Sequence, residues 1–280
     1  MKCKKILTAL LAAACTMSGC HGDLDIMQDN KLSASNMWID ESDAETATYG
    51  IYLYMRDALK SVHDIYLCWG EFRNGLWGAG TNKTLSGGDQ TQVRTSTMSS
   101  SNAYADWSVM YKTVNQANLI LKHVPEMGIS ESVRNFSLGN AYFSRAWCYF
   151  WIARIWGDAP LALTGYESTA GDLSLPRAPK AEIFARIESD LTEAERYVTD
   201  NSDKAVATPA AVQMLKADYA LWMYRVAGGG SSYLTMAEKA IEALNLSASR
   251  LESDYAQVFS SANKLNKEVI FAVHQANGEA

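Results

Sequence analysis

The sequence predicts an all-α fold built from tetratricopeptide-like helical hairpins that are connected by long irregular loops. Apolar residues recur at steps of three and four along most of the chain, which is the spacing of one helix face. Residues that typically begin and end helices bracket these runs. Several helix pairs have short connections and alanine-rich contact faces, although they match the strict tetratricopeptide pattern only weakly.

The predicted helices follow one another in order, each with its own start or stop signal. An acidic stretch at 40–45 precedes the first helix, and the third is dense enough in apolar residues to be buried on most sides. Gly157 and Pro160 end that third helix, whereas Thr208 and Pro209 supply an N-cap and a first-turn proline for the fifth. The six predicted helices cover residues 47–59, 104–118, 138–153, 180–198, 208–222 and 233–244.

Two stretches interrupt the helical period. Residues 64–101 contain glycine-broken aromatic sequence followed by a polar run, and residues 158–178 are punctuated by proline and glycine. Loops of this length inside a compact domain are usually functional or disordered. Neither stretch contains a glycine motif that would cradle a phosphate.

The first nineteen residues are typical of a secretory signal peptide. Three lysines precede an apolar run at 6–14, which is too short to span a bilayer. Ser18 and Gly19 directly before Cys20 resemble the lipobox of bacterial lipoproteins, in which the cysteine is acylated and becomes the first residue. We therefore expect a signal peptide at 1–19, a lipidated Cys20 with a tether at 20–40, and a helical domain at 41–280. The alternative is an ordinary signal peptide cut nearby, which leaves Cys20 as a free thiol.

The charge balance argues against a nucleic-acid partner. The 280 residues carry 31 acidic and 25 basic side chains, a net charge of −6. Removal of residues 1–19 deletes three lysines, so 22 basic and 31 acidic side chains give −9 for the remaining chain. No basic cluster offers the counterion release that drives binding to phosphates.

The cysteines do not form a disulfide framework. Once the signal peptide is cleaved and Cys20 is acylated, only Cys68 and Cys148 remain. One bridge between them is conceivable in an exported protein. Cys148 lies in a strongly apolar helical run, however, which favours an inert buried thiol.

No catalytic or metal-binding motif is found. The sequence has no H-E-x-x-H, C-x-x-C, G-x-S-x-G or EF-hand spacing, and its four histidines are scattered. His123 falls near the end of a predicted helix, where a cation is favourable for any helix. Glu71 lies near Trp69 and Trp77, but nothing identifies the second carboxylate that a glycosidase needs. We expect no enzyme activity, no metal and no cofactor.

Four segments resemble, in order and spacing, motifs of the SusD/RagB family of outer-membrane nutrient-binding lipoproteins. A fifth segment, Glu-Val-Ile-Phe, begins at Glu268 and is similar to the family's next motif. The four include Trp-Ser-Val-Met-Tyr and Asn-Gln-Ala-Asn, then Ser-Arg-Ala-Trp-Cys-Tyr-Phe, Trp-Gly-Asp-Ala-Pro-Leu, and Pro-Arg-Ala-Pro followed by a helix start. They occupy residues 107–118, 141–150, 156–161 and 176–191. The resemblance extends over residues 20–275.

The resemblance implies a function in nutrient capture. Members are lipoproteins with a tetratricopeptide-like scaffold that form the lid of a SusC-like TonB-dependent importer, and they bind glycans without chemistry. We therefore expect a lipid-anchored glycan-binding protein of the outer membrane that faces the cell exterior. The alternatives are a peptide-capturing RagB-like lipoprotein, or a helical-repeat scaffold that holds other proteins and no small ligand. Family members are close to twice as long, so the C-terminal half is expected to be absent.

Candidate ligand-binding residues lie in the first irregular stretch. A sugar ring needs a flat amphipathic ring beneath it and planar polar groups at its rim. Here Trp69 and Trp77 enclose Arg73 and Asn74, and Asn82 follows. These tryptophans act either as a ligand platform or as a plug over the scaffold. The family often has an acidic residue after the Glu-Leu-Arg-x stretch of its first long loop, and none follows the corresponding residues 71–75 here. This departure weakens any binding role that the resemblance implies for the loop.

Aromatic residues at helical spacing have a different interpretation. Their periodicity is typical of core packing between helices, and we expect that role for them. They are Trp107, Tyr111, Trp147, Trp151, Tyr219 and Trp222.

Overall fold

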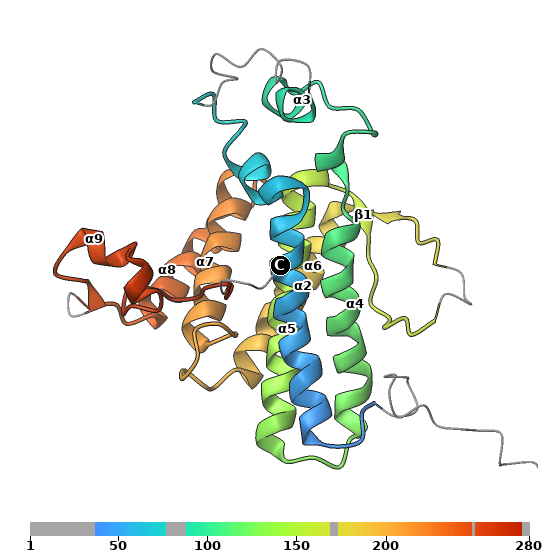
Figure 1. Ribbon diagram of the computed structural model, residues 1–280, viewed down its shortest axis with the longest axis vertical. Coiled ribbons are helices and arrows are strands. Elements are labelled where there is room, and N and C mark those ends of the chain that lie inside the picture. Colours follow the sequence, from blue (N-terminus) through green and yellow to red (C-terminus); the bar gives the residue numbers. More distant parts are fainter. Residues whose placement is uncertain (1–36, 77–87, 169–172, 248–249, 276–280) are drawn as a thin grey trace, which may run out of the picture. The chain divides into compact units, whose positions relative to one another are not determined.

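The computed structural model describes residues 37–76, 88–168, 173–247 and 250–275, without the side chains of 63 and 64 (Figure 1). The residues from Trp38 onward form one compact unit. The predicted signal peptide and Cys20 lie outside the described residues, as do most of the tether, Trp77 and Asn82.

The described residues confirm the all-α prediction. The six main helices are α2 (Glu41–Gly70), α4 (Ser108–His123), α5 (Glu131–Trp156), α6 (Lys180–Tyr197), α7 (Pro209–Arg225) and α8 (Ser231–Ala243). Two short helices are α3 (Asp89–Thr95) and α9 (Tyr255–Val258), and 3-10 turns cover Ala103–Ala105, Val124–Glu126 and Ser261–Asn263. Strands β1 (Ala159–Pro160) and β2 (Arg177–Ala178) form one antiparallel pair.

Several predicted helix boundaries are confirmed by the caps. Asp40 and Asp43 form a reciprocal capping box at the start of α2. The Thr208 hydroxyl accepts a hydrogen bond from the backbone N–H of Ala211, and Pro209 occupies the first turn of α7. Gly157 ends α5 with a φ of 73°, a conformation that glycine adopts without steric cost.

The predictions for residues 64–107 are wrong in three places. The α2 helix continues to Gly70, so Trp69 lies in its last turn rather than in a loop. The predicted second helix begins later than its aromatic pattern indicated, because Tyr104 lies in a 3-10 turn and Trp107 precedes the first helical residue of α4. The long stretch is also partly helical, since it contains α3.

The helices pack around α5, as Figure 1 shows for α2 and α4 beside it. More than half of its 26 residues are buried, which confirms the predicted burial on most sides. Helix α6 approaches α5 very closely at Gly139, where a Cβ atom would lie 2.7 Å from Cγ2 of Val198. Helices α7 and α8 form a further packed pair.

A buried ion pair joins α5 to α6 at the centre of this arrangement. Arg145 donates from Nε and Nη2 to the two carboxylate oxygens of Asp190 at 2.8 and 2.7 Å. Its Nη1 donates to Oδ1 of Asn118 on α4 at 2.7 Å. The side chains of Arg145 and Asp190 are 5% and 0% exposed. A buried pair of this kind is tolerated only when most of its hydrogen-bonding groups are satisfied.

Both cysteines are free and buried, so the bridge between Cys68 and Cys148 is not formed. Burial raises the pKa of the Cys148 thiol well above its usual range. The prediction that Cys148 is a buried thiol outside any bridge is confirmed, and the raised pKa disfavours the reactive thiolate.

Replacing Asp190 by Ala is expected to lower the free energy of unfolding by about 3–5 kcal/mol, because the Arg145 guanidinium stays buried without its partner. The matched control is Asp218→Ala, which removes the 53%-exposed partner of Arg154 and should cost less than about 1 kcal/mol. Urea denaturation followed by circular dichroism measures both. Equal losses in the two variants would contradict the central role of the buried pair.

Candidate functional site

Five tryptophan side chains form a continuous row across the ends of α2, α4 and α5. Successive ring centroids from Trp147 to Trp151, Trp69, Trp156 and Trp107 are 5.6, 5.9, 5.3 and 6.2 Å apart. All five rings are half-buried. We call this set the tryptophan row; separations of this size are those of interacting aromatic pairs.

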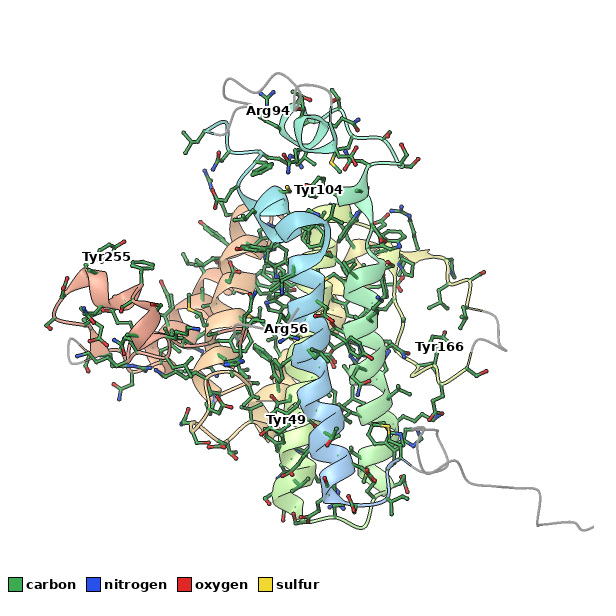
Figure 2. All side chains as sticks on the ribbon, in the orientation of Figure 1. Tyr49, Arg56, Arg94, Tyr104, Tyr166 and Tyr255 are labelled. Atoms are coloured by element: carbon green, nitrogen blue, oxygen red, sulfur yellow. The ribbon has the colours of Figure 1, made fainter. Side chains whose placement is uncertain are left out.

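Two members of the row are fixed by hydrogen bonds. The indole N–H of Trp69 donates to the carbonyl of Tyr104 at 2.9 Å, and that of Trp156 donates to the carbonyl of Ala105 at 3.1 Å. These bonds fasten the 103–105 turn onto the helix ends, where Figure 2 labels Tyr104. The N–H of Trp69 is therefore occupied within the protein, a contact that the sequence did not indicate.

The predicted polar residues lie in the turn that follows α2. Arg73 donates from Nη2 to the Ser96 hydroxyl at 3.3 Å. Asn74 donates to a carboxylate oxygen of Glu71 at 2.8 Å, and its own side-chain oxygen accepts from the N–H of Leu76 at 2.9 Å. Arg73 and Asn74 are exposed and close in sequence to the Trp69 end of the row. Their role in ligand binding stays a prediction.

The 159–167 segment runs along α4 and is held there by side chains of that helix. Tyr111 donates to the carbonyl of Pro160 at 2.6 Å, and Asn118 donates to that of Ala162 at 3.0 Å. Asn115 forms a reciprocal pair with the backbone of Tyr166, which Figure 2 labels on this segment, at 3.0 and 2.8 Å. The spacing of Tyr111, Asn115 and Asn118 places them on one face of α4. The sequence predicted core packing for Tyr111 but did not indicate that this face holds the 159–167 segment.

The C-terminal end of the 159–167 segment is held by charged side chains at the end of α4. Glu167 accepts from Lys122 and lies 2.7 Å from Nε2 of His123, the last residue of α4. The hydrogen bond from Lys122 is the main cause that holds the pKa of the Glu167 carboxyl below its usual range. His123 in turn stacks on Trp38, with ring centroids 4.9 Å apart.

A cleft of about 390 Å³ lies between α4 and this loop region, close to the Trp107 end of the row. The rings of Trp107 and Tyr111 line it together with Leu173 and Leu175. The Arg177 guanidinium lies 4.5 Å from the centroid of Trp107 and holds that ring from outside the cleft lining. The walls are thus mostly apolar.

The described residues contain no group of three or more side chains that could hold a metal ion. None of the described helices combines the length and apolarity that crossing a membrane requires. Burial raises the pKa of the Tyr111 and Tyr149 hydroxyls well above their usual range. Both hydroxyls donate to backbone carbonyls of the 159–167 segment, so the phenols hold that segment in place. The row itself offers aromatic rings, with the guanidinium groups of Arg154 and Arg177 beside them.

The scaffold and its surface rings define a helical protein of a known binding class. A family described as "Starch-binding associating with outer membrane" matches residues 79–223, just over half of the chain. The chain belongs to this SusD-like family, which confirms the resemblance seen in the sequence.

Individual relatives agree with this assignment. SusD-like protein P38 of Formosa agariphila is 26% identical over 68% of this chain and 36% of its own. The solved structure of B. fragilis NanU is 29% identical with a TM-score of 0.73, covering 89% of this chain and 51% of that chain. A laminarin-binding SusD-like protein, 18% identical with a TM-score of 0.67 over 83% of this chain and 51% of its own, shares the fold. This chain spans about half the length of those two solved structures and about a third of the curated relative.

Replacing Trp69 by Phe is expected to lower the free energy of unfolding by about 1 kcal/mol more than the same change at Trp151, because a smaller aromatic ring remains in both variants but the N–H donor to Tyr104 is lost only here. Trp69→Ala should cost about 3–5 kcal/mol, since the ring contacts with Trp151 and Trp156 are lost too. The control is Trp151→Phe, which removes no hydrogen bond within the described residues. Chemical denaturation measures all three; equal values for the two Phe variants would contradict the anchoring role.

Proposed function

We propose that this chain is a cell-surface glycan-binding lipoprotein that captures a polysaccharide or oligosaccharide and passes it to a SusC-like TonB-dependent importer in the outer membrane. The observation that carries the proposal is membership of a family described as starch-binding and associated with the outer membrane. The tryptophan row supports it, because stacked indoles are suited to the apolar faces of sugar rings. The protein would bind its ligand without transforming it.

We infer different roles for the residues at this end of the scaffold from their contacts. Trp69 and Trp156 hold the end of the scaffold rigid through their N–H groups. The exposed Arg73 and Asn74 follow this rigid end, and Trp77 and Asn82 come next in the sequence. Residues that follow a rigid anchor lose less conformational entropy when they bind a ligand. We propose that Trp77 supplies the platform and that Arg73, Asn74 and Asn82 contact the sugar hydroxyls.

Affinity electrophoresis against a panel of polysaccharides tests the binding function. We expect at least one polysaccharide to retard the protein, and Trp77→Ala to weaken that binding about tenfold through loss of a stacking platform. The melting temperature of Trp77→Ala should equal that of the wild type. A lowered melting temperature would identify Trp77 as a structural plug, and binding to peptides without any polysaccharide would favour a RagB-like role.

A second experiment tests the anchor and the partner. Cys20→Ser should move the protein from the outer-membrane fraction to the soluble fraction, because acyl chains contribute about 0.8 kcal/mol for each buried methylene. The wild type should also recover a large β-barrel protein from solubilised outer membranes. Membrane association that survives Cys20→Ser would contradict lipidation at this residue, and recovery of no barrel would favour a scaffold without an importer.

A further inference from the structure

Trp147 and Trp151 differ from the anchored members of the tryptophan row. They lie one turn apart on α5, with ring centroids 5.6 Å apart and planes tilted by 49°. Their indole N–H groups have no hydrogen-bond acceptor in the part of the chain that the structure describes, whereas those of Trp69 and Trp156 are occupied. Both rings are half-buried, so part of each is exposed at the surface.

A cavity of about 510 Å³ adjoins Trp147. Helices α5 and α7 and the 268–271 segment provide its walls, and its floor is apolar. Met214 and Leu221 on α7 remain 47% and 43% exposed there. This volume lies within the range of small-molecule sites, which hold a ligand of a few rings.

Polar groups border the two rings on one side. The Arg154 guanidinium lies 4.1 Å from the centroid of Phe150 and 5.0 Å from that of Trp151, so its plane is held against the aromatic surface. It also contacts the carboxylate of Asp218 at 3.5 Å. Asp218 is 53% exposed and itself lines the cavity.

The apolar cavity and the charged groups beside it together determine which ligand the site suits. An apolar side chain laid across it would desolvate the Asp218 carboxylate without offering a donor, which is costly. The hydroxyls of a sugar can donate to that carboxylate and accept from Arg154 and the free indole N–H groups. The apolar C–H face of the same ring can stack on an indole.

We propose that Trp147 and Trp151, with Arg154 and Asp218 at the rim, form a second glycan-binding surface, separate from the residues that follow α2. This inference rests on the proposed glycan-binding function and adds a distinct subsite to it. Two subsites on one scaffold would let the protein hold a longer saccharide at two points, which raises the overall affinity through effective concentration.

The test uses the purified full chain and two named probes, amylopectin and laminarin, in affinity electrophoresis. For whichever probe retards the wild type, Trp147→Ala is expected to weaken binding about tenfold, and Asp218→Ala, which is on the surface and should fold normally, about threefold. Trp147→Phe should recover part of the affinity, because a ring is restored without its N–H donor. Tyr255→Ala, which removes a 78%-exposed ring outside the cavity, is the matched control and should not change binding.

The outcomes separate this inference from the function on which it rests. A wild type that binds a probe while Trp147→Ala and Asp218→Ala bind it equally well would overturn the second subsite and leave the glycan-binding function intact. A wild type that binds neither probe nor any other polysaccharide would overturn both. Quenching of tryptophan fluorescence by the bound probe that decreases in Trp147→Phe would further support direct contact.

Discussion

The buried ion pair between Arg145 and Asp190 is the constraint on which the arrangement depends. A guanidinium removed from water must be paired and hydrogen-bonded, so α5 and α6 can dock only where both oxygens of Asp190 meet it. The remaining donor of Arg145 orients Asn118 on α4, and Asn118 in turn donates to the carbonyl of Ala162. One charge pair thereby fixes three helices and the segment that covers α4.

This chain of contacts also positions the surface rings. The covering segment begins with β1, whose partner β2 contains Arg177, the residue that holds Trp107 at one end of the tryptophan row. The other rings come from α2 and α5, which pack together along their length. The row therefore forms where separate elements meet. Its anchored members, Trp69 and Trp156, stabilise this junction, while Trp147 and Trp151 keep their donors available.

The groups along the row suit a ligand with both apolar surfaces and hydroxyls. The phenols of Tyr111 and Tyr149 are used inside the protein, where each donates to a backbone carbonyl of the 159–167 segment and burial raises its pKa. The indole rings and the N–H groups of Trp147 and Trp151 match the apolar and hydroxyl surfaces of a sugar. Membership of the SusD-like family agrees with this chemistry, although the chain spans only about half the length of the NanU and laminarin-binding structures.

The sequence by itself determined the helices, most of their ends and the family, because period, caps and glycines act over a few neighbouring residues. Thr208, Pro209 and Gly157 are examples that local chemistry explains completely. Only the tertiary structure decided that Trp69 ends a helix and donates to Tyr104, and that Arg145 meets Asp190. Those contacts join residues 35 and 45 positions apart, and such pairs leave no periodic signal, because their partners are selected by packing rather than by the local chain.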